Sequence, residues 1–435
     1  MRLLIKNGRV ICPATGRDAV LDVLVEGGKI LKVQPRIKAS KARVIDAEGL
    51  VVAPGFIDMH VHLREPGQED KETIETGSRA AAKGGFTTIC CMPNTVPPND
   101  NVVLTRFIRE KARRATVNVL PIAAVTRGLE GRQLTDMAGL LKAGAVAFSD
   151  DGRPVWNSLV MRRALETARL LSALIIDHCQ DQRLSDEGVM NEGVRSASLG
   201  LRGIPAAAED IPLARDIILS ETSGARLHIA HLSTKGGVRL LREAKKRKVP
   251  VTAEVTPHHL FLTDEAVVAS DANFKVNPPL RGREDVEALR SAVKEGWIDV
   301  IATDHAPHTA QEKGRDFDNA PFGINGLESA VSLMLDRLVN KRTLSLIQLV
   351  RMMSTAPADL LGLKNKGALR PGADADLTLL DLESWTVVDV DSFASKSRNS
   401  PFHGWKLKGI PVGVLVAGRM AYPFDGRLAD REKSS

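Results

Sequence analysis

Short apolar runs alternate with longer amphipathic stretches through the middle of this 435-residue chain. Eight apolar runs follow Pro54, at residues 56–59, 87–91, 117–123, 145–148, 173–177, 226–230, 249–254 and 298–303. Between them lie segments with helical periodicity, among them residues 71–83, 102–114, 158–171, 207–221, 235–248 and 283–295. This alternation is typical of βα units, and eight such units predict an α/β fold built on a (β/α)₈ TIM-type barrel.

The two ends of the chain have a different pattern. Before Pro54, short strand-like runs at residues 3–6, 21–26, 30–33 and 43–47 are separated by turn residues. From about Gly367 the chain returns to strand-like runs at residues 376–381, 411–416 and 419–420. We expect the two ends to form one small composite β domain. The predicted division is therefore 1–53 and 366–435 for that domain and 54–365 for the barrel.

Composition excludes several classes of protein. Hydrophobic residues make up 43% of the chain and charged residues 26%, which is ordinary for a globular protein and unlike a disordered one. Aromatic residues are only 4%, too few for the stacking surfaces that bind single-stranded nucleic acid. No apolar run approaches the roughly 18 residues of a membrane span, and the N-terminus does not resemble a signal peptide.

Charge and cysteine content refine this picture. The net charge of +7 agrees with an anionic small-molecule substrate and indicates nothing more specific, and we expect no nucleic-acid or membrane partner. The four cysteines include no CxxC pair, which is typical of a reducing compartment. The sequence therefore predicts a cytoplasmic protein.

Histidine and aspartate stand at the ends of five of the eight predicted barrel strands. They are His60 and His62, the pair Asp150 and Asp151, His178, His231, and Asp304. Barrels of this type carry their active sites at that rim, and two histidines at i and i+2 on an extended segment point to one side. Imidazole and carboxylate together suit Zn²⁺, and six ligands exceed the needs of one four-coordinate ion. The pattern predicts a two-metal site with a shared carboxylate.

Two long motifs carry a family resemblance. The stretch PGFIDMHVHLREPG at residues 54–67 and the stretch ATDHAPH at residues 302–308, with Lys313 beyond it, resemble the two signatures of the dihydroorotases in the amidohydrolase superfamily. Similarity continues through MPNT at 92–95, FSDDG at 148–152 and VNPPLR at 276–281, so it covers essentially the whole chain. The pattern is that of the class I, bacterial-type branch.

The resemblance implies a role for each strand-end residue. His60 and His62 would bind one zinc ion, His178 and His231 the second, Asp151 would lie between them, and Asp304 would complete the first site. Related dihydropyrimidinases carry a carboxylated lysine at the end of the fourth strand, where this chain offers only Asp150 and Asp151. Glu65 replaces an aspartate found in many relatives, which is a conservative change.

The implied reaction is the reversible zinc-dependent cyclisation of N-carbamoyl-L-aspartate to (S)-dihydroorotate in pyrimidine synthesis. Asp304 would act as general base and acid beside a water that two ions activate as hydroxide. Arg64 would clamp the substrate carboxylate. The implied substrate contacts are His62, Leu63, Arg64, Asn94, Asn277, His308, Phe322 and Gly323.

Two alternatives remain at this point. The chain could be another cyclic-amide hydrolase of the dihydropyrimidinase or hydantoinase type, or an inactive homologue that serves as an assembly partner of aspartate transcarbamoylase. The missing lysine and Arg64 argue against the first, and the six retained ligands argue against the second. We expect a homo-oligomer, with aspartate transcarbamoylase as a candidate partner.

Other polar residues receive weaker predictions. We expect His228 and His305 to lie behind the ligands, because side chains alternate along an extended segment and these two point away from His231 and Asp304. His258 and His259 end the seventh predicted strand, and we expect them at the rim or in the core. The polar segment 309–320 beside His308 reads equally as a lid or as a surface loop.

Overall fold

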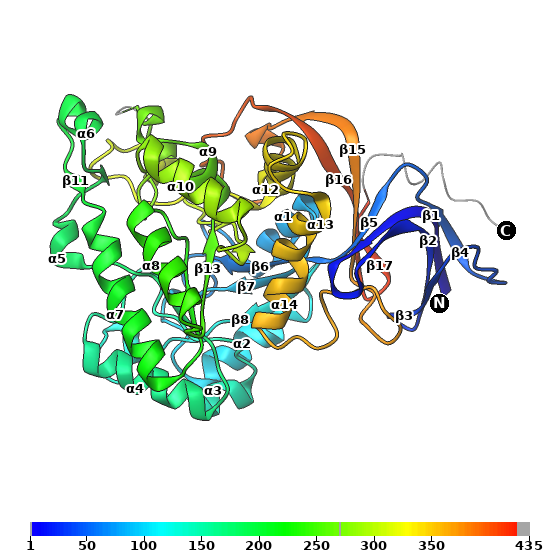
Figure 1. Ribbon diagram of the computed structural model, residues 1–435, viewed down its shortest axis with the longest axis horizontal. Coiled ribbons are helices and arrows are strands. Elements are labelled where there is room, and N and C mark those ends of the chain that lie inside the picture. Colours follow the sequence, from blue (N-terminus) through cyan, green and yellow to red (C-terminus); the bar gives the residue numbers. More distant parts are fainter. Residues whose placement is uncertain (1, 269–270, 424–435) are drawn as a thin grey trace.

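A computed structural model describes residues 2–268 and 271–423 of the chain (Figure 1). The alternating middle of the chain forms a closed barrel of eight parallel segments, here called staves, most of which are β-strands. Seven staves are regular strands: β6 (Phe56–Val61), β7 (Phe86–Cys91), β8 (Asn118–Pro121), β9 (Ile175–Asp177), β12 (Leu227–Ile229), β13 (Val251–Val255) and β14 (Val300–Ile301). A bridge between Val61 and His305 joins the last stave to the first. The predicted (β/α)₈ barrel is confirmed.

The fourth predicted strand, residues 145–148, is not a regular strand. Only Phe148 forms bridges, to Ala123 on one side and Ile175 on the other. Val146 donates to the carbonyl of Pro121 while Ala123 donates to that of Ala147, one residue further than a regular parallel ladder requires. This slip in register interrupts the strand but keeps the stave in place.

Helices return the chain between staves. They are α1 (Ile74–Gly84), α2 (Val102–Ala112), α3 (Met137–Ala143), α4 (Ser158–Leu170), α7 (Ala207–Ser223), α8 (Lys235–Lys246), α10 (Arg283–Lys294) and α12 (Leu327–Met334). The helix predicted from residue 71 begins at Ile74, because the Thr73 side chain accepts from the backbone N–H of Thr76 as an N-cap. Shorter elements are α5 (Gln182–Ser185), β10 (Met190–Asn191), α6 (Val194–Leu199), β11 (Gly203–Ile204), α9 (Pro257–Phe261), α11 (Ala310–Lys313), α13 (Leu346–Val350) and α14 (Ala356–Leu360).

The two chain ends share one eight-stranded sheet, at the right of Figure 1. Its strands are β1 (Arg2–Cys12), β2 (Arg17–Glu26), β3 (Lys29–Gln34), β4 (Arg43–Asp46), β5 (Val51–Pro54), β15 (Leu377–Val387), β16 (Lys406–Val416) and β17 (Arg419–Pro423). The antiparallel pair β5–β15 joins the N-terminal strands to the C-terminal ones. Leu3 and Ile5 share a buried apolar cluster with Leu377 and Leu415, so the composite sheet has a core of its own.

The chain between β15 and β16 does not stay with the sheet. The Ser397 hydroxyl donates to the carbonyl of Lys71 (2.9 Å), and the backbone N–H of Ala394 donates to Glu328 (2.9 Å). This segment therefore lies against the barrel, although it falls inside the range 366–435 assigned to the β domain; the predicted boundaries stay a prediction. Among the described residues, no helix is long and apolar enough to span a bilayer.

A glycine sets the contact between α1 and α12. A Cβ atom on Gly84 would lie 2.0 Å from the carbonyl oxygen of Leu327, a backbone atom that cannot rotate away. We expect Gly84→Ala to lower the free energy of unfolding by about 1–3 kcal/mol, the usual cost of overpacking. Denaturant unfolding measures this. Gly282→Ala is the control, since its Cβ would meet nothing closer than 3.7 Å; equal midpoints for both variants would contradict the prediction.

Candidate metal centre and active site

Six buried side chains from five staves meet at the carboxyl-terminal mouth of the barrel. They are the six predicted ligands His60, His62, Asp151, His178, His231 and Asp304. His60 lies near the end of β6 and the other five lie just beyond the end of a stave, which brings all six to that rim. The backbone of His231 (φ 29°) and of Asp304 (φ 47°) lies in the left-handed region, as does that of Arg64 (φ 61°). Strain of this kind in residues other than glycine clusters at functional sites.

The carboxylate of Asp151 lies between two pairs of histidines. Its Oδ1 is 3.4 Å from His60 Nε2, 3.6 Å from His178 Nδ1 and 3.7 Å from His231 Nε2. Its Oδ2 is 3.5 Å from His62 Nε2. Asp151 thereby belongs to two separate groups of three donor atoms, each group lying within 4.8 Å. Asp150, the other aspartate at this stave end, turns away and accepts from the backbone of Val125 and Thr126.

Several atoms of this cluster have no hydrogen-bond partner although they are buried. They are Nε2 of His60, Oδ1 of Asp151 and Nδ1 of His231. Buried polar atoms in folded proteins are almost always paired, and a bound ion would satisfy unpaired atoms at the centre of such a cluster. Imidazole nitrogen and carboxylate oxygen are donors that transition-metal ions such as zinc prefer. The residues therefore fit a metal centre.

The electrostatics of the cluster favour positive charge. Burial alone would lower the pKa of His60, but the carboxylates of Asp151, Glu254 and Asp304 outweigh it and hold that pKa well above its ordinary value. Burial alone would raise the pKa of Asp304, but His60 and His62 hold it well below the ordinary range. The carboxylates are thus ionised at neutral pH, as metal ligands must be.

Glu254 on β13 supports the histidines from behind. It is fully buried, with Oε1 2.6 Å from His60 Nδ1 and Oε2 3.2 Å from His228 Nε2, and it accepts from the backbone N–H of His231 (3.2 Å). Contact with Nδ1 fixes the His60 ring so that Nε2 faces Asp151. Sequence reasoning missed this residue, although a lone glutamate inside an apolar strand was a usable signal.

Gln180 was also missed. Its Oε1 lies 2.9 Å from His178 Nε2 and accepts from Asn277 Nδ2 (2.8 Å). The amide therefore couples one histidine of the cluster to a predicted substrate contact. Gln180 follows His178 by two residues, so the alternation that places one side chain toward the mouth places both there.

Three further histidines, His228, His259 and His305, are buried outside the two groups of metal donors. His228 contacts Thr252 (2.8 Å) as well as Glu254, and His305 lies 3.3 Å from Glu72. His259 contacts the carbonyl of Pro278 (2.9 Å) in the buried interior.

A pocket of about 330 Å³ opens over the cluster. Its wall includes seven of the eight predicted substrate contacts, namely His62, Arg64, Asn94, Asn277, His308, Phe322 and Gly323. Leu63 is the exception, because its side chain lies in the hydrophobic core beside Gly77. The Leu63 side chain therefore does not line this pocket, and a substrate contact at Leu63 stays a prediction.

Arg64 brings a buried positive charge to this pocket. The residue is 9% exposed, its Nε donates to the carbonyl of Pro307 (3.2 Å), and its Nη2 lies 3.2 Å from His308 Nε2. Burial lowers its pKa only to about 10, so the guanidinium stays charged. Among residues 2–268 and 271–423 it has no ion-paired carboxylate. A buried charge without a counter-ion is costly, and an anion in the pocket would offset that cost.

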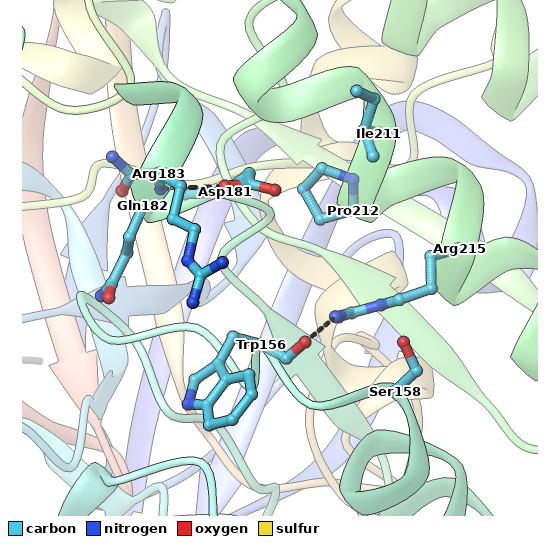
Figure 2. Close-up of a pocket in the computed structure, with 9 residues that line it drawn as sticks. Trp156, Ser158, Asp181, Gln182, Arg183, Ile211, Pro212 and Arg215 are labelled. Carbon is cyan, nitrogen blue, oxygen red and sulfur yellow. Dashed lines mark hydrogen bonds between the residues drawn. The ribbon is translucent and has the colours of Figure 1, made fainter. Parts of the chain in front are cut away.

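A second hollow, of about 570 Å³, lies beside α5 and α7 (Figure 2). Trp156, Arg183 and Ile211 line it, together with Arg215, whose guanidinium already contacts both oxygens of Asp216 (2.7 and 2.9 Å) and donates to the carbonyl of Trp156 (3.0 Å). The described residues that line it include no histidine and no unpaired buried polar atom. We place the chemistry in the smaller pocket.

Comparison with known proteins agrees with this geometry. Residues 49–237 match the family described as Dihydro-orotase-like, and residues 226–422 match the Amidohydrolase family. The chain is 54% identical to a dihydroorotase of Pelotomaculum thermopropionicum over 97% of this chain and 98% of the relative, and 52% identical to one of Syntrophus aciditrophicus over 98% and 100%.

Solved structures resemble the fold closely. The L-hydantoinase (dihydropyrimidinase) from Arthrobacter aurescens superposes with a TM-score of 0.87 at 28% identity, covering 97% of this chain and 96% of that one. The D-hydantoinase (dihydropyrimidinase) from a Thermus species gives 0.83 at 28% identity, over 98% and 96%. Identity of half or more over the full length outweighs these more distant likenesses, and the chain belongs to the dihydroorotase family of the amidohydrolases.

Proposed function

We propose that this chain is a dihydroorotase that interconverts N-carbamoyl-L-aspartate and (S)-dihydroorotate with two zinc ions. The observation that carries the proposal is that two groups line one pocket: the shared carboxylate of Asp151, and the guanidinium of Arg64, which has no ion-paired carboxylate among the described residues. The first suits a two-metal hydrolase, and the second demands an acidic substrate. Dihydroorotate carries the carboxylate that hydantoins and dihydrouracil lack.

The metal ligands follow from the two groups around Asp151. His60, His62 and Asp304 would hold one ion, and His178 and His231 the other, with Asp151 between them. When bound, the ions lower the pKa of water and polarise the scissile carbonyl. Glu254 would keep the His60 ring in the ligating orientation.

The wall of the pocket orients the substrate. Arg64 would bind its carboxylate, with Asn94 beside it. Burial and the charge of Arg64 lower the pKa of His308 to about 2, so this imidazole is neutral and its tautomer decides whether Nε2 accepts from Arg64 or donates to the carbonyl of Phe322 (2.9 Å).

The ring amides of the substrate need acceptors. The N–H of Gly323 is already donated to the carbonyl of Lys275 (2.9 Å). The carbonyl oxygens of Phe322 and Gly323 would therefore meet the ring N–H groups, while the amide of Asn277 can supply either a donor or an acceptor.

Asp304 would carry the proton. Its Oδ1 lies 3.0 Å from His62 Nε2, and its pKa is held far below neutrality, so it can accept the proton of the attacking water. The C–N bond of the ring then breaks, and Asp304 returns the proton to the departing ring nitrogen. Cyclisation runs the same steps in reverse.

A direct assay tests the proposed function. The purified chain, with its metal content measured, should consume dihydroorotate in an ultraviolet assay and act poorly on dihydrouracil. Equal rates on the two substrates would indicate a dihydropyrimidinase, and a metal-loaded chain without turnover would indicate an inactive homologue. Homo-oligomer formation, association with aspartate transcarbamoylase and the cytoplasmic location stay predictions.

Loss of one ligand should empty one metal position. We expect His178→Ala to hold about one zinc ion per chain instead of two, because three donors are needed at each position. Elemental analysis with circular dichroism measures metal content and fold. His259→Ala, a buried histidine outside both groups, should keep both ions. Full occupancy in His178→Ala would remove that residue from the site.

The guanidinium should matter for its shape as well as its charge. Arg64→Lys keeps the charge but loses the planar fork, so kcat/KM for dihydroorotate should fall by about 10- to 1000-fold, the effect of one or two charge-assisted bonds. The weak activity on dihydrouracil serves as the control and should not change. An equal fall in kcat/KM on both substrates would mean that Arg64 stabilises the fold and does not bind the substrate carboxylate.

Asp304 should be needed for proton transfer beyond metal binding. Asp304→Asn retains an oxygen but cannot take up the proton, so kcat should fall by at least about 100-fold, a typical general-base contribution. Rates from about pH 6 to 9, read with metal content, measure this. A variant with both ions and most of its activity would leave Asp304 as a ligand only.

A further inference from the structure

The peptide of Gly323 on the pocket wall is held from both sides. Its N–H donates to the carbonyl of Lys275 (2.9 Å), and its carbonyl accepts from Asn399 Nδ2 (3.0 Å). A Cβ here would lie 2.6 Å from the carbonyl oxygen of Ala306, and φ is 148°, so only glycine fits without strain. The backbone that faces the substrate is thus fixed by groups outside the pocket.

Asn399 comes from the segment between β15 and β16. It is buried, its Nδ2 also donates to the carbonyl of Ala306 (3.0 Å), and its Oδ1 accepts from the backbone N–H of His308 (3.2 Å). One amide thereby uses both donors and its acceptor to join the stretch that carries His308 to the stretch that carries Gly323. No other hydrogen-bonding side chain of this size offers two donors and an acceptor without a charge, apart from glutamine, which is longer.

Lys313 makes the corresponding connection on the other side. Its Nζ donates to the carbonyls of Ala272 (2.8 Å), Pro321 (2.9 Å) and Lys275 (3.2 Å). Three donors meet three backbone acceptors, so the ammonium joins the loop before Asn277 to the residue before Phe322. The carbonyl of Lys275 receives both Lys313 and the N–H of Gly323, which links this connection to the Gly323 peptide.

Packing alone does not explain a lysine at this position. Burial and the nearby charge of Lys275 lower the pKa of Lys313 to about 7, which reflects the cost of a buried ammonium. An apolar side chain would fill the space at lower cost. The three directed bonds are what an apolar side chain could not provide.

The same contacts bear on the segment 309–320, read from sequence as a lid or a surface loop. It begins with α11, which Thr309 caps, and Glu312 forms an ion pair with Lys71 (2.8 Å). With Lys313 bonded to three carbonyls, the start of this segment is a fixed part of the wall.

We propose that Asn399 and Lys313 are positioning residues for substrate binding. They hold the carbonyls of Phe322 and Gly323 and the loop of Asn277 where the ring amides of dihydroorotate bind, without touching the substrate themselves. This inference rests on the proposed function for the identity of the substrate, and on the hydrogen bonds alone for the rigidity of the wall.

Steady-state kinetics with dihydroorotate test the positioning role. Asn399→Asp keeps the size but turns two donors into acceptors facing carbonyls, and Lys313→Met keeps the packing but removes the ammonium. Each should raise KM by about 10-fold or more while kcat stays within about 3-fold and metal content is unchanged, the signature of lost binding that is common to ground and transition states. Asn399→Ser, which keeps one donor, should give an intermediate KM.

Lys366→Met is the matched control. Lys366 pairs with Asp376 (2.5 Å) and Asp374 (3.1 Å) before β15, and none of these three residues lines the active-site pocket. Its loss should lower thermal stability without raising KM. If this control raised KM as much as the two test variants, or if both test variants kept the wild-type KM, the proposal would be overturned.

Hydrogen exchange separates this proposal from the proposed function. In Asn399→Asp and Lys313→Met, a peptide containing Gly323 should exchange its amides at least about 10-fold faster than in the unaltered chain, because opening of the wall becomes easier. That readout needs no substrate. An unaltered chain inactive on dihydroorotate would refute the proposed function, whereas unchanged exchange at Gly323 in both variants would refute the positioning role.

Discussion

The contact of one buried carboxylate with four imidazoles governs the mouth of this barrel. Asp151 lies 3.4–3.7 Å from the four histidines, at a depth where an isolated ionised carboxylate would cost several kcal/mol. Each of the four histidines must therefore turn a ring nitrogen toward the Asp151 carboxylate. Glu254 behind His60, Asn94 behind His62 and Gln180 behind His178 meet that requirement. This explains why a strand interior carries a fully buried glutamate, Glu254.

Fold and substrate are decided by different residues. The hydantoinase of Arthrobacter aurescens shares the architecture at 28% identity, so the barrel and composite sheet do not select a substrate. We propose that selection falls to the pocket wall, where Arg64 is buried without an ion pair to any described residue and His308 is neutral. A substrate with a carboxylate completes the charge balance of this wall, and a neutral cyclic amide leaves it incomplete.

The sequence predicted what depends on local pattern. The six strand-end residues were found because an apolar strand and the polar residue that ends it are adjacent in the chain, and barrel geometry brings such ends together. A linear motif does not say which way each side chain points, so it could not distinguish Leu63, whose side chain lies in the core, from His62 and Arg64, which line the pocket. Glu254 and Asn399 were missed for a different reason: their partners lie far away in sequence, His60 at 194 positions and Gly323 at 76. Contacts at such separations appear only after the chain has folded. The irregular fourth stave depends likewise on its pairing with β8.

The pairing of β5 with β15 has a consequence for how the molecule comes into being. More than 300 residues separate the two strands, as the bond from Phe56 to Thr378 illustrates with a separation of 322. During synthesis β5 leaves the ribosome long before β15 exists, so one edge of β5 stays unsatisfied until nearly the whole chain has been made. Contacts of such long range form slowly, because loop closure must precede any gain from pairing. The composite sheet therefore forms late, when β15 pairs with β5. The pocket wall is also completed late, because it takes Asn399 from the stretch after β15. An incomplete chain has neither.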